Sequence, residues 1–498
     1  MTAPAGGSPR LREAVRTVLR QAVETYRDSP PALRWLRHHL DRYDEPLRLA
    51  IAGKVKAGKS TLLNALVGEE IAPTDAGECT RVVTWYQDGH APAVTLYPRS
   101  GPPRRLRIAR DEGALQIDMG VPAETVDRLE VTWPSASLRA TTLIDTPGIA
   151  SLSLDVSARS ERFLAPEDAP TAADAVLYLM RHLHSADVRF LESFHDQGVA
   201  RAAPVNTVAV LSRADEIGVG RIDALRSARV IAARYRADET LRAFCQTVVP
   251  VAGLIAVTGR TMRQDEFASL SKLAAMPPEK LDALLLTVDR FATAEDGVEL
   301  PTATRAKLLE RFGLFGLRLS TTLIRQGVGD ASTLAAELVQ RSGLVELREV
   351  LATQFSQRRD LLKARSALIA LDLVLRREPR PAAAPLAVEV ERILAGAHEF
   401  VELRLLSDLR GRVVRLPKEQ AEEAERLIGG AGGAAHQRLG LPPEAGPDEL
   451  RAVALDRLSA WRRRAESPLS SRAAANAARV VVRSCEGMLA GLGQGQDG

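Results

Sequence analysis

A glycine- and lysine-rich segment, Gly53–Ser60, carries the residue types most directly suited to chemistry. It matches the pattern GxxxxGK[ST] in full, which lies between a strand and a helix in proteins that bind nucleotide phosphates. There, the glycines let backbone N–H groups surround the phosphates, the Lys59 ammonium reaches the β- and γ-phosphates, and the Ser60 hydroxyl ligates Mg²⁺. The predicted phosphate-binding residues are Gly53, Lys54, Val55, Lys56, Ala57, Gly58, Lys59, Ser60 and Thr61.

The segment Asp145–Gly148, with the sequence DTPG, is a second candidate. It follows a short apolar run that predicts a strand. A carboxylate in this place can hold the water shell of Mg²⁺, and the Gly148 amide can contact the γ-phosphate. We therefore expect Asp145 and Gly148 to complete the phosphate side of the site.

The segment SRAD, which follows a buried strand, predicts recognition of the base. The Asp215 carboxylate can accept two hydrogen bonds, from the N1–H and N2 amino groups of guanine, which adenine lacks. Arg213 has a long cationic stem that can lie over the base, whereas Ser212 is shorter than the Asn or Thr usual at its position. After the next strand, the Ala252 amide is expected to donate to guanine O6, beside Gly253. GTP and GDP with Mg²⁺ are therefore the expected ligands.

A threonine between these segments is expected to bind Mg²⁺ and sense the γ-phosphate. The candidates are Thr74, Thr80 and Thr84. Thr80 lies at the entry to a strand, where a loop meets the sheet, while Thr74 lies in the loop and Thr84 within the strand. We expect Thr80 to be this residue, so the predicted metal ligands are Ser60, Thr80 and Asp145.

Alternating strands and helices are predicted to position these segments. Short apolar runs predict strands, and a 3.6-residue periodicity between them predicts helices. From residue 142 onward the two alternate, which favours a mostly parallel, doubly wound sheet. The predicted strands are Leu47–Ala52, Val82–Tyr86, Ala93–Tyr97, Leu106–Ala109, Leu129–Trp133, Thr142–Ile144, Ala175–Met180, Thr207–Leu211 and Thr247–Val251.

Beyond residue 260 only helical patterns occur. Apolar positions predict one helix over Leu344–Arg377, about 50 Å long at 1.5 Å per residue, and a second over Leu386–Arg410. The chain is therefore expected to form an α/β head on an elongated helical stalk. The expected division is N-terminal helices that pack into the helical bundle (1–45), the head (46–341) and the bundle (342–498).

The composition excludes several classes of protein. The 67 Lys and Arg face 63 Asp and Glu along the whole chain, so the net charge of +4 indicates a mixed surface and no nucleic-acid partner. Cys79, Cys245 and Cys485 lie far apart, which argues against a disulfide framework or a cysteine zinc site and favours the cytoplasm. No apolar run is long enough to span a membrane, and the start of the sequence lacks the apolar core of a secretory signal.

Together these motifs resemble those of dynamin-like GTPases. GKVKAGKS, a threonine at a strand start, DTPG and SRAD occur in that order, and SGLVELREVLATQF with RRDLLKARSAL resembles the start of a bacterial dynamin stalk. The arginine-rich composition adds a likeness to the actinobacterial group that includes the isoniazid-inducible proteins. The resemblance implies a P-loop GTPase domain that hydrolyses GTP and dimerises through its heads or associates with a dynamin-like paralogue. It also implies membrane remodelling through the stalk, at the inner face of the plasma membrane.

One departure from the family concerns catalysis. Dynamins carry Gln-Ser where this chain has Val55-Lys56, and Val55 cannot position a water by hydrogen bonding. Lys56 stands where guanylate-binding proteins place an arginine that acts in cis. The resemblance thus leaves two roles open for Lys56: a cation for the transferring phosphoryl group, or a residue that points into solvent. The predicted catalytic residues are Lys56, Lys59 and Thr80.

Other functions stay open. The chain could be a GTP-responsive scaffold or partner of a membrane-active paralogue, with little hydrolysis of its own. A translation or ribosome-assembly GTPase is opposed by the long stalk and the lack of an RNA-binding module. Contact with an anionic membrane is expected at the turn between the two long helices, where Arg376, Arg377 and Arg380 accompany Glu378. The loop Gly429–Ala435 is the second candidate for this contact.

Overall fold

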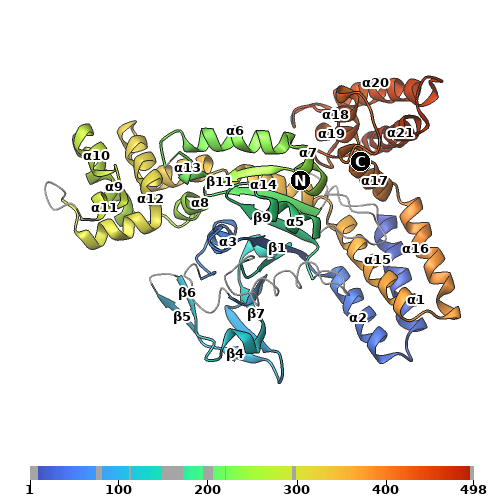
Figure 1. Cartoon of the computed structure of the whole chain (residues 1–498), viewed down its shortest axis with the longest axis horizontal. Helices are drawn as coiled ribbons and strands as arrows, with labels where there is room; N and C mark the ends of the chain where they lie inside the picture. The colour runs from blue at the N-terminus through green and yellow to red at the C-terminus, as the bar shows by residue number, and fades with distance from the viewer. Residues whose placement is uncertain are drawn as a thin grey trace.

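The computed structural model describes residues 9–73, 81–111, 114–148, 172–193, 206–218, 220–293 and 299–493. An α/β head occupies the centre of the molecule, a helical lobe extends from one side of it, and two helical bundles lie on the other side (Figure 1). The expected architecture, an α/β head with a mostly parallel sheet and a helical region, is confirmed.

The head is built on a nine-stranded sheet with the order β11-β10-β9-β1-β8-β2-β7-β3-β4. The five strands from β11 to β8 are all parallel, whereas β2 pairs antiparallel with β8. A separate hairpin, β5–β6, includes a strand that the sequence did not predict, β6. The strands are β1 (Leu47–Gly53), β2 (Val83–Asp88), β3 (Ala93–Pro98), β4 (Arg104–Leu106), β5 (Ile108–Asp111), β6 (Ala114–Ile117), β7 (Val126–Trp133), β8 (Thr141–Asp145), β9 (Ala175–Met180), β10 (Thr207–Ser212) and β11 (Val248–Val251).

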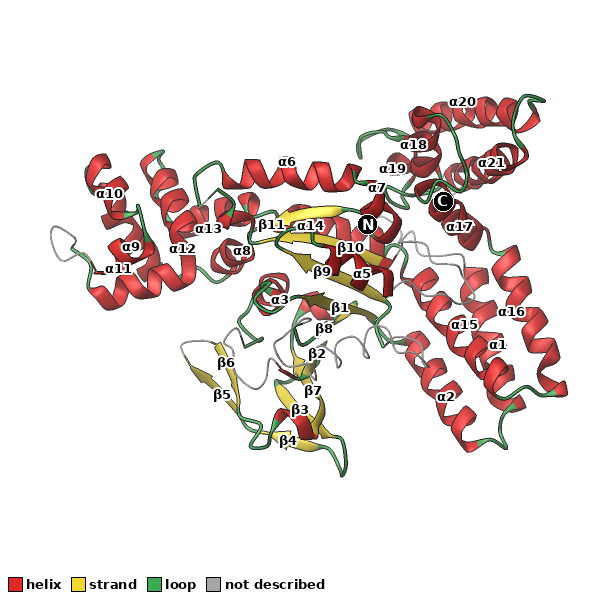
Figure 2. Ribbon diagram, viewed as in Figure 1, coloured by secondary structure: helices red, strands yellow, loops and turns green. Residues whose placement is uncertain are grey.

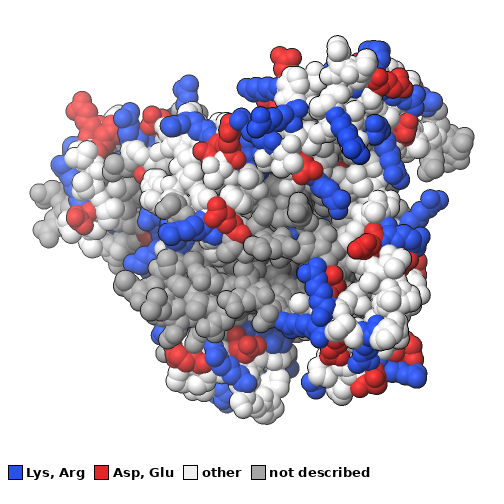
Figure 3. Space-filling model, turned by 45° about the vertical axis from the view of Figure 1, so that its right-hand side comes forward, with Lys and Arg blue, Asp and Glu red and all other residues white. Residues whose placement is uncertain are grey.

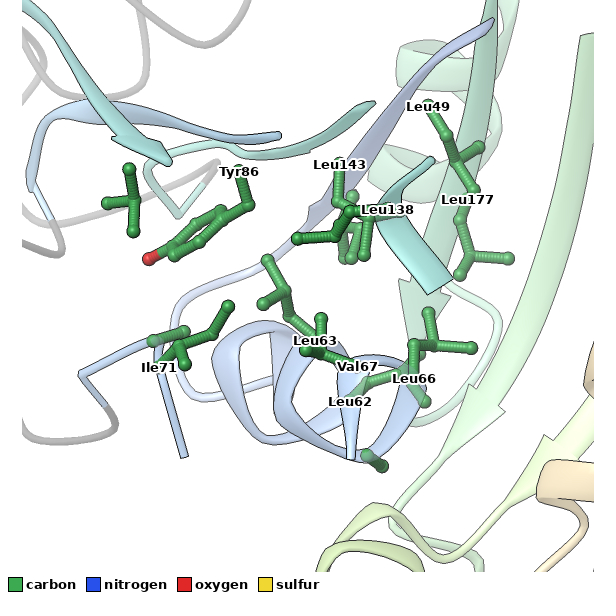
Figure 4. Close-up of a cluster of buried hydrophobic side chains, with 14 of the residues drawn as sticks. Leu49, Leu62, Leu63, Leu66, Val67, Ile71, Tyr86, Leu138, Leu143 and Leu177 are labelled. Carbon is green, nitrogen blue, oxygen red and sulfur yellow. The ribbon is translucent and has the colours of Figure 1, made fainter. Parts of the chain in front are cut away.

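Helices cover both faces of the sheet, which explains the continuous apolar runs of β1, β9 and β10. One face holds α3 (Lys59–Val67), α8 (Gly253–Arg260) and α14 (Leu344–Leu351). The other holds α5 (Ser185–Ser193), α6 (Ala224–Ala237) and α7 (Glu239–Phe244). Figure 4 shows Leu62, Leu63 and Leu66 of α3 facing Leu143 and Leu177 of the sheet. This packing fixes α3 against the strands that carry the predicted site.

Five helices form the lobe beside the head (Figure 2). They enclose an apolar core of their own, which includes Phe291, Phe312 and Leu338. A Cβ on Gly259 of α8 would lie within 3.0 Å of Ala335 O, so this glycine allows the lobe to pack closely on the head. The helices are α9 (Gln264–Ala275), α10 (Pro278–Leu284), α11 (Val288–Thr293), α12 (Thr302–Arg325) and α13 (Ala331–Arg341).

Two bundles make up the rest of the helical region. The N-terminal helices α1 (Pro9–Thr25) and α2 (Pro30–Asp44) pack with α15 (Arg359–Arg377) and α16 (Ala384–Gly396) in the first bundle. Continuing from α16, the chain enters the second bundle, which lies beside α7 of the head (Figure 1). This bundle consists of α17 (His398–Arg410), α18 (Lys418–Leu427), α19 (Ala435–Leu439), α20 (Pro447–Glu466) and α21 (Arg472–Gly493).

The prediction of one long helix over Leu344–Arg377 is wrong. The chain forms α14, a π-helical turn over Ala352–Ser356, and then α15. Leu344 and Phe355 belong to the apolar core of the head, whereas Leu371 belongs to the core of the first bundle. The apolar residues of α14 and of the π-helical turn therefore pack into the head, whereas most of those of α15 pack into the first bundle, and the α-helix is interrupted between them. Likewise, the predicted helix over 386–410 is interrupted at Ala397, between the two bundles.

A buried ionic cluster joins the head to the first bundle. Asp174, directly before β9, is fully buried and accepts hydrogen bonds from the Arg42 guanidinium at 2.7 Å and from the Arg48 backbone amide at 3.0 Å. The Lys363 ammonium of α15 lies 3.1 Å from the second carboxylate oxygen. Arg42, Arg48, Asp174 and Lys363 are called the Asp174 cluster below. It connects α2, β1, β9 and α15 at one point.

Candidate nucleotide-binding site

The loop from Gly53 to Gly58 connects β1 to α3, as the pattern predicts. A Cβ on Gly53 would lie 2.5 Å from Leu179 O of the neighbouring strand, so only glycine fits there. Gly58 and Lys56 both have positive φ angles, 90° and 59°, and Lys56 adopts this conformation without being glycine. The backbone thus turns sharply around the N-terminus of α3, where free amides favour an anion.

The Lys59 side chain folds back over this loop. Its ammonium donates to the Gly53 and Lys54 carbonyls at 3.3 and 3.4 Å. Burial lowers the pKa of Lys59, and the nearby Asp145 carboxylate opposes this shift. The cation is therefore held at the centre of the loop, where the pattern predicts phosphate.

Ser60 and Asp145 meet at the start of α3. The Ser60 hydroxyl donates to one Asp145 oxygen at 2.7 Å, while the other oxygen, Oδ1, is buried and has no hydrogen-bond partner among the described residues. Burial raises the pKa of Asp145, although Lys59 and Ser60 both favour the carboxylate. A hydroxyl and an unsatisfied carboxylate oxygen beside a phosphate loop suit Mg²⁺, which binds oxygen ligands and keeps several waters.

Gly148 lies directly against the phosphate loop. A Cβ at this position would come within 2.5 Å of the Val55 side chain and 2.8 Å of its Cα atom. The segment is anchored by Thr146, whose hydroxyl donates to Ile51 O at 2.9 Å. The structure therefore brings Asp145 and Gly148 to the loop that the sequence assigned to phosphate.

A cavity of about 130 Å³ opens beside the loop, at the carboxyl ends of β9, β10 and β11. Ala57 and Thr61 line one part of it, and Ser212, Arg213 and Asp215 line another. In parallel sheets this edge is where ligands bind. The phosphate loop and the SRAD segment thus share one continuous site.

Asp215 and Glu216 are the two carboxylates that line this cavity, and Asp215 is the buried one. Its side chain is buried, and burial raises the pKa of Asp215 to about 6. Arg213 has a positive φ of 52°, and its guanidinium pairs with Glu216, as does that of Arg181. The Ser212 hydroxyl donates to Met180 O at 3.2 Å and so ties β10 to β9. Because arginines bind the Glu216 carboxylate, that of Asp215 is the acceptor available to a base, beside a fixed arginine stem.

The expectation for the Ala252 amide is wrong. Ala252 is fully buried and its N–H donates to the Ser342 carbonyl at 2.9 Å. Ser342 lies just before α14, so a segment 90 residues downstream occupies this donor. Gly253 and Leu254, at the N-terminus of α8, line the cavity instead.

The structure does not test the prediction that Thr80 binds Mg²⁺, since Thr74 and Thr80 lie outside the described residues. Thr84 pairs with Asp145 across β2 and β8, but its hydroxyl is buried and donates to Val82 O at 3.3 Å. Thr80 stays a prediction.

Sequence reasoning missed Asp187, a partner of the phosphate loop. Its buried carboxylate accepts hydrogen bonds from Lys54 Nζ at 3.0 Å, Tyr178 Oη at 2.7 Å and the His184 amide at 2.9 Å. Lys54 is thereby fixed, whereas Lys56, two residues on, is exposed. An aspartate in the first turn of a helix, after a buried strand, was the signal available in the sequence.

Comparisons with known proteins show to which protein family these motifs belong. Residues 49–211 match the model of the Dynamin family. The isoniazid-induced protein IniC of Mycobacterium tuberculosis, in two strains, is 44% identical over 487 residues, which cover 96% of this chain and 98% of the relative. The chain belongs to the dynamin family. Its resemblance to the isoniazid-inducible group is thereby confirmed.

Two further proteins are more distantly similar to this chain. The bacterial dynamin-like protein of Nostoc punctiforme is 31% identical over 165 residues, which are 30% of this dynamin-family chain and 22% of that protein. A solved structure, described as an oligomerised bacterial dynamin pair that senses and tethers membranes, covers 97% of this chain and 76% of its own at 13% identity and a TM-score of 0.32. At that score, the likeness says nothing further about this chain.

Among the described residues, no helix combines the length and apolar character needed to cross a membrane. Nor do three or more His, Cys, Asp or Glu side chains gather there as a metal site.

Proposed function

We propose that this dynamin-family protein binds GTP with Mg²⁺ and hydrolyses it. The observation that carries the proposal is the hydrogen bond between Ser60 and Asp145 at the N-terminus of α3, beside a cavity that holds Asp215. A phosphate loop, two oxygen ligands and a base-reading carboxylate then share one edge of the sheet. We infer that Thr80 adds the third metal ligand.

Each residue has a distinct part in the proposed reaction. The loop amides and Lys59 would bind the phosphates, while Ser60 and Asp145 would hold Mg²⁺ through hydroxyl and carboxylate oxygens. When bound, Mg²⁺ neutralises charge on the β- and γ-phosphates. Asp215 would accept the two guanine N–H groups, and the Arg213 stem would cover the base. Gly148, against Val55, would bring its amide toward the γ-phosphate.

Lys56 is the residue we propose as the cation for the transferring phosphoryl group. It is exposed on the loop, whereas the Lys54 ammonium is already bound by the buried Asp187. Lys56→Ala should lower GTP turnover with little change in GTP affinity, because the charge it meets develops in the transition state. Lys280→Ala, at an exposed position on α10 of the lobe, is the matched control, and an unchanged turnover in Lys56→Ala would show that Lys56 has no catalytic part.

Turnover at rising protein concentration tests the choice between an enzyme and a scaffold. If heads dimerise across their nucleotide faces, or pair with a paralogue, the rate per molecule should rise with concentration. A GTP-responsive scaffold would bind GTP without such turnover at any concentration. Ser60→Ala, which removes a proposed Mg²⁺ ligand, supplies the inactive control.

We also propose that the protein remodels anionic membrane at the cytoplasmic face, through the turn between α20 and α21. The arginines expected to contact lipid are engaged elsewhere: Arg376 pairs with Asp372 at 2.6 Å, and Arg380 pairs with Asp28 and Glu378. By contrast, Leu469 is 95% exposed in the turn after α20, which lies at the outer end of the second bundle (Figure 2). An exposed leucine between cationic helix ends suits insertion into a lipid surface.

Co-sedimentation with anionic liposomes tests this contact. Leu469→Ser should reduce binding about tenfold or more, since one leucine side chain contributes about 1.5–3 kcal/mol when fully buried. A triple change of Arg376, Arg377 and Arg380 to Ser should leave binding nearly intact. The reverse pattern would return the contact to the turn between α15 and α16.

A further inference from the structure

A cleft of about 1,070 Å³ lies between the head and the second bundle. Its walls come from the ends of α6 and α7 on the head, and from the end of α17, the loop 411–417 and α18 on the bundle. This size is just above the usual range of about 300–1,000 Å³ for small-molecule sites. Since it lies away from the residues that line the base cavity, it is separate from the proposed nucleotide site.

Cations outnumber anions in this cleft. Three carboxylates line it, from Glu239, Glu422 and Glu425. Figure 3 shows Lys and Arg side chains gathered on the upper, bundle side of one face. We call this site the basic cleft. It is lined by six cations: Arg236, Arg242, Arg410, Arg412, Arg415 and Lys418.

The carboxylates present do not balance these cations. Glu425 is shared, because Arg242 lies 2.6 Å from one of its oxygens and Arg410 lies 3.2 Å from the other. Arg412 pairs with Glu239 across the cleft. Arg415, Lys418 and the third carboxylate, Glu422, are exposed and have no ion-pair partner among the described residues. Two cations on the bundle side, against one carboxylate, are therefore available to a ligand.

Hydrogen-bond donors are also in excess. The Arg410 guanidinium, buried beneath the cleft, donates to Gln246 Oε1 at 3.1 Å. That leaves the Gln246 Nε2 group buried with no acceptor among the described residues. The accessible groups of Arg415 and Lys418 are hydrogen-bond donors only, so the cleft favours a ligand rich in acceptor oxygens.

We propose that the basic cleft is a second binding site, for a phosphate-bearing anion held by Arg415 and Lys418 of the bundle and by Arg242 of the head. Phosphate oxygens accept paired hydrogen bonds from arginine and tolerate several donors at once. The anion would bridge the two parts and stabilise the arrangement seen here, since a ligand favours the state that binds it. It could be a lipid headgroup or a free phosphate compound, because both present the same group.

The test is calorimetric titration of the full chain saturated with GDP and Mg²⁺, so that the phosphate loop is occupied. The probes are inorganic pyrophosphate, glycerol 3-phosphate and dioctanoyl phosphatidic acid below its micelle concentration. Wild type should bind at least one probe. The double variant Arg415→Ser/Lys418→Ser should bind it about tenfold more weakly or worse, as expected for the loss of charged hydrogen bonds.

The control is Arg226→Ser/Arg229→Ser, which removes two exposed arginines of α6 outside the cleft and should leave binding unchanged. A phosphatidic acid affinity well above that of glycerol 3-phosphate identifies a lipid headgroup, and equal affinities identify a free phosphate compound. Binding of no probe, or equal binding by both double variants, would overturn the proposal. GTP turnover of the Arg415/Lys418 variant should stay at the wild-type level, so the outcome is independent of the proposed hydrolysis.

Discussion

Asp145 and Asp174, each with a buried carboxylate oxygen, lie at the ends of the two strands that flank β1, at opposite edges of the sheet. Asp145 ends β8, at the carboxyl edge beside the phosphate loop. Asp174 precedes β9, at the amino edge that meets the first bundle. In parallel sheets the carboxyl edge carries ligand sites, so the same residue type serves different purposes at the two edges.

Their surroundings show the difference. The Asp174 carboxylate is compensated by Arg42 and Lys363, and these partners lower the pKa of Asp174 to about 2 despite its burial. The Asp145 carboxylate has one hydrogen bond and an unsatisfied oxygen, and burial raises the pKa of Asp145. A fully paired aspartate holds parts together, whereas an incompletely paired one is left available for a ligand.

The largest effect is expected from Asp174→Ala. Removing the carboxylate leaves Arg42 and Lys363 buried without their partner, which should lower the free energy of unfolding by about 3–5 kcal/mol. Denaturant unfolding measures the loss. The control Asp41→Ala, at an exposed position on α2, should change stability by less than about 0.5 kcal/mol. A loss equally small for Asp174→Ala would show that the cluster does not join the two parts.

Asp145→Asn should have the opposite profile. The free energy of unfolding should not fall, because the amide keeps an acceptor for Ser60 and removes a buried charge. Mg²⁺-dependent GTP turnover should fall by about a hundredfold or more, since the metal loses an anionic ligand. Parallel denaturant and turnover assays check both expectations. Lower stability with normal turnover would make Asp145 a structural residue like Asp174.

A smaller effect on the free energy of unfolding is expected at acidic pH. A folded pKa near 2 for Asp174, against an ordinary value of about 4, means that its carboxylate stabilises the fold by about 2 kcal/mol above pH 5. This contribution is lost as pH falls from about 5 to 2. The stability difference between wild type and Asp174→Asn should therefore shrink over that range. The raised pKa of Asp145 has the opposite sign, so the stability of wild type relative to Asp145→Asn should rise as pH falls through that pKa.

Sequence alone predicted those elements of the site that follow from a local pattern of residues. β1, the phosphate loop and α3 follow from one octapeptide and its flanks, and DTPG and SRAD each follow a strand. The parts that were missed depend on long-range contacts. Asp174 meets Arg42 from 132 positions away, and the Ser342 carbonyl reaches the Ala252 amide from an unrelated segment.

The broken helix shows the same limit. Leu344 and Leu362 fit one helical periodicity and both pack into the core of the head, yet Leu371 of the same predicted helix packs into the core of the first bundle. Periodicity reports which face of a helix is apolar and not which neighbour covers it. The sequence therefore predicted the elements of the head in detail, but not the place where the head ends and the bundle begins.

The most direct test of the account is nucleotide choice by Asp215. Equilibrium binding of GTP, ATP and xanthosine triphosphate should be measured for wild type and Asp215→Asn. We expect wild type to prefer GTP over ATP, and the variant to lose about 1–3 kcal/mol of GTP affinity while gaining affinity for xanthosine triphosphate. Wild-type GTP affinity should also fall below pH 6, as the Asp215 carboxylate protonates. Equal affinities of wild type for GTP and ATP, with no change in the variant, would contradict the assignment of this cavity to guanine.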